Sequence, residues 1–159
     1  MPTKVVRLAH LCVHLRTMDA PSWNYSVRYV DPLRTENTHL ASGQTIVTDA
    51  PTDNHGLGQT FSPTDLLSTS LAACVMTIMG IHVQGKDFRI ESIDANVQKT
   101  MASSPRRVDA IEVVFEVRVS GSCSDQDLAV LERVARACPV AKSLHPDVAQ
   151  NLAFQFYRV

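Results

Sequence analysis

The chain has 159 residues, of which 45% are hydrophobic and 19% charged, and its net charge is −1. This composition fits one soluble domain with its own core, and the lack of any basic cluster argues against nucleic acid or an anionic membrane as a partner. Four widely and irregularly spaced cysteines exclude the dense disulfide framework of a small secreted protein and favour the cytoplasm.

Residues 1–23 are interpreted as an N-terminal extension of unknown role, and residues 24–159 as a single domain. A short apolar patch in the extension is interrupted by two histidines, and no acid occurs before Asp19. The patch lacks the cleavage pattern of a secretory signal peptide. A loosely docked tail and an amphipathic targeting leader both remain open.

The domain begins with a pattern of short strands. Apolar and polar residues alternate over 25–29, and the turn signal Asp31-Pro32 follows. Further strands are predicted over 35–40 and 44–48, which together make an antiparallel meander. Residues 49–61 are rich in Pro, Gly, Asn and Asp and predict an exposed loop, whose length hints at a function.

The segment 62–82 predicts the central helix. Ser62 is a good N-cap, Pro63 suits the first helical position, and Asp65 can meet the free amides of the first turn. No formal charge occurs between Asp65 and Lys86, and apolar side chains fall on every face of the helix. We therefore expect a helix that is buried all round. Its small and hydroxyl residues argue against a membrane span.

The rest of the domain predicts strands and a second helix. A strand is expected over about 89–100, with a slip in phase near Ser92, and a half-exposed strand over 111–119. Ser124 and Asp127 form an acidic variant of the capping box before a helical pattern. Pro139 must break or restart that helix, and alternation over 152–157 predicts a closing strand.

The chemistry is to be sought in the thiols. No spacing of Cys or His predicts a metal site, and neither a nucleophilic-serine elbow nor a phosphate loop is present. Cys138 precedes Pro139 and can cap a new helical turn, where the helix N-terminus and Lys142 both favour a thiolate. Cys74, in the middle of the central helix, is either an inert core residue or a reactive thiol that draws on a cation elsewhere in the fold.

Two segments carry a resemblance to a known family. Residues 61–74 read FSPTDLLSTSLAAC, and residues 137–144 read ACPVAKSL. Together with residues 33–36, the loop 49–56 and the order of the strands, these segments resemble the two cysteine motifs of the OsmC/Ohr family, the osmotically inducible and organic hydroperoxide resistance proteins.

The resemblance implies an α+β two-layer fold, with antiparallel strands around a buried central helix that carries a cysteine, and an intertwined homodimer. It implies an enzyme, a thiol-dependent peroxidase, in which Cys74 attacks a hydroperoxide and Cys138 resolves the sulfenic acid. Arg34 would stabilise the thiolate, with Arg28 in reserve. No bound cofactor is implied; an external dithiol, such as a lipoyl group, would restore the thiols.

One departure from the family pattern concerns the first cysteine motif. Peroxidase members carry a glutamate directly after its proline, paired with the arginine, whereas this chain has Thr64 there and Asp65 next. We expect Thr64 or Asp65 to orient Arg34. The alternative function is a redox-responsive binding or sensing protein for a hydrophobic small molecule, without peroxidase turnover.

Overall fold

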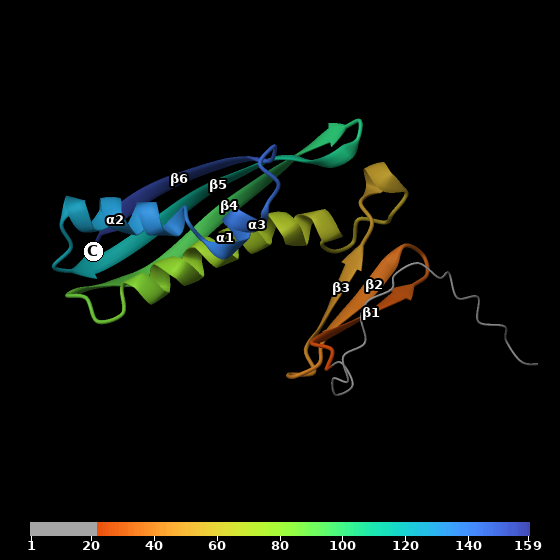
Figure 1. Cartoon of the computed structure of the whole chain (residues 1–159), viewed down its shortest axis with the longest axis horizontal. Helices are drawn as coiled ribbons and strands as arrows, with labels where there is room; N and C mark the ends of the chain where they lie inside the picture. The colour runs from red at the N-terminus through yellow and green to blue at the C-terminus, as the bar shows by residue number, and fades with distance from the viewer. Residues whose placement is uncertain (1–21) are drawn as a thin grey trace, which may run out of the picture.

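The computed structural model describes residues 22–159. Residues 1–21 of the N-terminal extension expected over residues 1–23 lie outside the described residues. The strands form two separate sheets of three, in the orders β1-β2-β3 and β4-β5-β6. Figure 1 shows the first sheet standing to one side of a larger body, in which the second sheet is covered by helices. The expected α+β class is confirmed.

The first sheet is the meander that the sequence predicts. It consists of β1 (Tyr25–Val30), β2 (Arg34–His39) and β3 (Thr45–Asp49), each antiparallel to the next. The first and last residues of β2 and β3, Arg34 and Asp49, lie opposite each other in this ladder. The loop that follows contains a short 3-10 turn, η1 (Thr52–Asn54).

The central helix α1 (Pro63–His82) begins where the sequence predicts. The Ser62 side chain accepts a hydrogen bond from the backbone N–H of Asp65, and the Asp65 side chain accepts one from the N–H of Ser62. This reciprocal capping box satisfies two amides that the helix itself leaves free. It fixes the start of α1 relative to the preceding loop.

The second sheet is built on a long hairpin of β4 (Phe88–Ser103) and β5 (Arg106–Gly121). The slip in phase predicted near Ser92 is a register shift between Ile90 and Ser92. The closing strand β6 (Ala149–Arg158) pairs with β5 in parallel, which departs from the expected antiparallel arrangement. The reason is the connection, because two helices carry the chain back to the end of the sheet where β5 began.

The core lies between the second sheet and the helices α1 and α2 (Asp125–Ala135), as Figure 1 shows. Helix α2 starts with the predicted capping box of Ser124 and Asp127. The large apolar side chains that are completely buried come from α1, β5 and α2: Leu71, Val75, Met79, Ile111, Phe115, Val117, Val119 and Leu131.

The expectation that α1 is buried all round is wrong for the single chain. One face of the helix packs into the core, while Leu67 and Ile81 on another face remain 41% and 56% exposed. The first sheet is also open, since Tyr25, Val27 and Tyr29 are more than half exposed. By length and composition α1 could cross a membrane, but a core helix meets the same criterion. Among residues 22–159, no segment covers these apolar surfaces.

Candidate functional site

Two thiols from distant parts of the chain meet beside α1. Cys74 lies midway along α1 and is half-buried, whereas Cys138 is completely buried at the N-cap of α3 (Pro139–Ser143). Helix α3 packs against α1, and Cys74 lies near enough to the Cys138 thiol to contribute to the rise in its pKa. Both thiols are free. The fold therefore brings together the two cysteines that the sequence singled out.

Burial raises the pKa of the Cys138 thiol. The backbone N–H of Ala141 donates to the Cys138 sulfur at 3.4 Å, which lowers this pKa. The neighbouring Cys74 raises it further. The predicted N-cap position is therefore present, but the expected preference for a thiolate is not. Lys142, which was expected to help, is exposed on the following turn. Desolvation of the sulfur outweighs the helix terminus.

Arg34, the predicted cation, is engaged away from the thiols. Its Nη2 donates to the side-chain oxygen of Gln59 and lies 3.5 Å from Oδ2 of the completely buried Asp49. Across residues 22–159, no hydrogen bond or ion pair joins Arg34 to Cys74. The reserve candidate Arg28 is exposed and pairs with Glu36 on the neighbouring strand. Within one chain neither arginine reaches the thiol pair.

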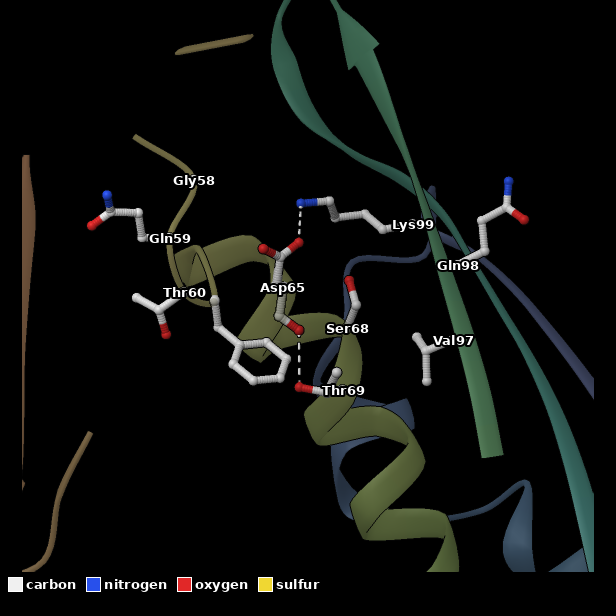
Figure 2. A pocket seen from close by; sticks show the side chains of 10 residues that line it. Gly58, Gln59, Thr60, Asp65, Ser68, Thr69, Val97, Gln98 and Lys99 are labelled. Atoms are coloured by element: carbon white, nitrogen blue, oxygen red, sulfur yellow. Dashed lines mark hydrogen bonds and ion pairs between the residues drawn. The ribbon is translucent and has the colours of Figure 1, made fainter. Parts of the chain in front are cut away.

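Thr64 and Asp65 have a different cation. Lys99, on β4, donates from Nζ to Oγ1 of Thr64 at 2.8 Å and to Oδ1 of Asp65 at 2.6 Å. Figure 2 shows the Lys99 side chain reaching from the sheet to the first turn of α1. Partial burial of Asp65 acts to raise its pKa, but the hydrogen bonds from Lys99 and Ser62 outweigh this effect and lower it. In the single chain these residues contact Lys99 and not Arg34.

This ion pair lines a hollow of about 760 Å³ between α1, β4 and the loop before α1. Phe61, Thr69 and Val97 form further parts of its wall. Figure 2 shows Thr69 on α1 and Val97 on β4. Cys74 lies nine residues after Asp65, which is about two and a half helical turns and therefore the opposite flank of α1. The hollow and the thiol pair are thus separate features of the helix.

Sequence reasoning missed three residues that organise this region, namely Asp49, Gln59 and Lys99. Lys99 carried a usable signal, because it continues the inward-facing phase of Ile93, Ala95 and Val97 on β4. A lysine at such a position needs a partner. The pairing of Asp49 with Arg34 and Gln59 had no comparable local signal, since it depends on how the loop folds back over β3.

The comparisons with known proteins agree with this architecture. A family model described as OsmC-like protein matches residues 56–152, which is more than half of the chain and includes both Cys74 and Cys138. The chain belongs to the OsmC-like family. The comparison with curated proteins gave no match.

Solved structures of OsmC and Ohr proteins resemble the chain over most of its length. A protein of Psychrobacter arcticus 273-4, named for osmotic stress induction and a detoxification response, is 40% identical, with 86% of this chain and 98% of that chain covered and a TM-score of 0.79. The organic hydroperoxide resistance protein OhrB of Bacillus subtilis is 18% identical, with 84% and 98% covered and a TM-score of 0.53. An organic hydroperoxide resistance protein OsmC of Legionella pneumophila is 12% identical, with 86% and 99% covered and a TM-score of 0.59. At these low identities, the last two comparisons show a likeness of fold alone.

Proposed function

We propose that this OsmC-like protein is a thiol-dependent peroxidase that reduces organic hydroperoxides with Cys74 and Cys138. The observation that carries the proposal is the meeting of these two free thiols from α1 and α3, one half-buried and one completely buried. Membership of a family with named organic hydroperoxide resistance proteins supports a role in peroxide stress.

The half-buried thiol, Cys74, is assigned the first step. Its thiolate attacks the terminal oxygen of the hydroperoxide, the O–O bond breaks, and the departing alkoxide takes a proton to leave as an alcohol. The cysteine becomes a sulfenic acid. Cys138 then attacks that sulfur, forming the disulfide and releasing water, which protects Cys74 from irreversible further oxidation. Complete burial suits Cys138 to the second step because it shields this thiol from direct attack by peroxide.

Restoring the thiols requires two electrons from outside the protein. A dithiol such as a lipoyl group would attack the Cys74–Cys138 disulfide, and its second thiol would complete the exchange as a cyclic disulfide. This cycle needs no bound cofactor. It also fits the cytoplasm, where reducing systems keep free thiols available.

The proposal includes a homodimer, because residues 22–159 leave large apolar surfaces uncovered. The open face of β1–β3 and the exposed side of α1 that carries Leu67 and Ile81 together form the kind of surface that obligate dimers bury. A sheet of three short strands cannot cover such a face by itself. A second copy would then bring Arg34 toward the thiols, where its charge favours the Cys74 thiolate and the departing oxygen.

A turnover assay tests this proposal. The protein is mixed with an alkyl hydroperoxide and a dithiol, and hydroperoxide consumption is followed over many equivalents. Cys74→Ser should abolish consumption, while Cys123→Ser, which changes a thiol on another part of the surface, should leave it unchanged. Full turnover by Cys74→Ser would refute the assignment. Stoichiometric oxidation of the native protein without turnover, whichever dithiol is supplied, would favour the alternative of a redox-responsive binding protein.

A further inference from the structure

We propose that Asp49 is the positioning residue of Arg34, presenting the guanidinium in a fixed orientation for the reacting thiolate. This inference rests on the proposed function, in which Arg34 favours the thiolate of Cys74. It adds a residue to which the sequence analysis assigned no role. It also gives a role to a buried carboxylate that the proposed chemistry does not otherwise use.

Asp49 is built into the fold as a rigid carboxylate. Its side chain is completely inaccessible to solvent, and its Oδ2 accepts a hydrogen bond from the backbone N–H of Gln59 at 3.0 Å. That bond is the main reason why the pKa of Asp49 lies below its usual range. The N–H of Asp49 in turn donates to the carbonyl of Phe61 at 3.1 Å. The carboxylate therefore stays ionised and fixed between β3 and the loop that leads to α1.

Arg34 is placed for this carboxylate by the sheet itself. The two residues are direct partners in the β2–β3 ladder, so their side chains leave the same face of the sheet. Nη2 of Arg34 is shared between Asp49 and the side-chain oxygen of Gln59. Asp49 and Gln59 belong to different segments, and both accept from Nη2 of Arg34. Together they restrict the orientation of the guanidinium.

The bonds to Asp49 and Gln59 use only one nitrogen of the Arg34 guanidinium. An arginine has five N–H donors, and the bonds to Asp49 and Gln59 both come from Nη2. Nε of Arg34 and Oδ1 of Asp49 are both buried and have no partner among the described residues. Buried polar atoms without partners are rare and call for a functional or structural reason. The Nε of Arg34, unpartnered within residues 22–159, is consistent with a guanidinium that is held in place for another group.

The experiment measures how fast Cys74 is alkylated at different pH values, with the modified peptide identified by mass spectrometry. Arg34→Met should move the midpoint of this profile to higher pH by about one unit, as the loss of a nearby cation does. Asp49→Asn should move it in the same direction, Asp49→Glu should restore it in part, and the double variant should match Arg34→Met alone. Asp53→Asn, which removes an exposed partner of Arg106, is the matched control and should leave the profile unchanged.

Three results in the Asp49 variants would overturn the inference: no shift in Asp49→Asn, a shift to lower pH in Asp49→Asn, or effects that add in the double variant. The second result would make Asp49 a competitor for the guanidinium. If Asp49→Asn does not fold, Gln59→Leu removes the other acceptor at Nη2 of Arg34. An unchanged alkylation profile in Gln59→Leu counts against the inference. A missing shift in Arg34→Met also refutes the inference, whereas the proposed function is decided separately by hydroperoxide turnover in Cys74→Ser.

Discussion

Cys74 on α1 is a neighbour of the Cys138 thiol at the N-cap of α3 and contributes to the rise in its pKa, although the two residues are 64 positions apart in the sequence. The two thiols differ in their surroundings, since Cys74 is half-buried and Cys138 completely buried. This difference in burial is the reason why Cys74 is assigned the attack on the hydroperoxide and Cys138 the resolution of the sulfenic acid. It also makes the reactivity of Cys138 predictable.

Cys138 should react slowly with alkylating reagents at neutral pH, because burial raises its pKa and the thiolate is the reacting form. Alkylation should become appreciable only above the ordinary thiol pKa of about 8.5. Peptide mass spectrometry after timed iodoacetamide treatment measures this directly. A small free thiol such as glutathione is the reference, and faster alkylation of Cys138 than of glutathione at pH 7 would contradict the burial argument.

Lys99→Met should destabilise the protein by about 1 kcal/mol, a modest value because Asp65 is partly exposed. The lowered pKa of Asp65 means that the folded state binds its proton less readily than the unfolded chain does. The stabilisation is therefore present above the unfolded pKa of about 4 and is lost as the pH falls through the folded pKa. Urea unfolding of the native protein and of Lys99→Met, at pH 7 and again well below pH 4, measures the difference in the free energy of unfolding at each pH.

Two controls accompany this comparison. Lys99→Arg keeps the charge and should recover part of the loss, while Lys142→Met removes an exposed lysine without an ion pair in the described part of the chain. The difference between Lys99→Met and the native protein should shrink at low pH. An equal difference at both pH values would show that the lysine acts through its hydrocarbon chain and not through its charge.

Leu67→Arg should disrupt the proposed homodimer, because it places a charge on the exposed apolar side of α1. Light scattering after size exclusion should give twice the 17.5 kDa chain mass for the native protein and a monomer for the variant. Asn96→Arg, on the exposed outer face of β4, is the matched control and should stay dimeric. A native protein that runs as a monomer at micromolar concentration would refute this part of the proposal.

Local features of the sequence predicted much of the fold. The N-cap of α1 at Ser62, the cap of α2 at Ser124 and the restart of the helix after Cys138 each depend on neighbouring residues, and each is confirmed. The meander and the phase slip near Ser92 follow from alternation over a few residues. Such signals need only the local chain, so they can be interpreted without knowledge of the tertiary fold.

Features that depend on distant residues were less accessible. The pairing of Lys99 with Asp65 joins residues 34 positions apart, and the parallel placement of β6 depends on the path of the connection across α2 and α3. The apolar pattern of α1 was correct as composition but wrong as burial in one chain, because a sequence pattern does not say which neighbour covers a face. The two cysteine motifs identified the family, and the geometry added the carboxylate beside Arg34.

The most direct test of the thiol-pair mechanism is to identify the bond formed when the reduced protein receives one equivalent of an alkyl hydroperoxide. Mass spectrometry of the unreduced digest should find a disulfide between the peptides of Cys74 and Cys138, which a dithiol then removes. Cys138→Ser should instead retain a sulfenic acid on Cys74. Recovery of both cysteines as free thiols, or a disulfide that involves Cys123 in place of Cys138, would contradict the account.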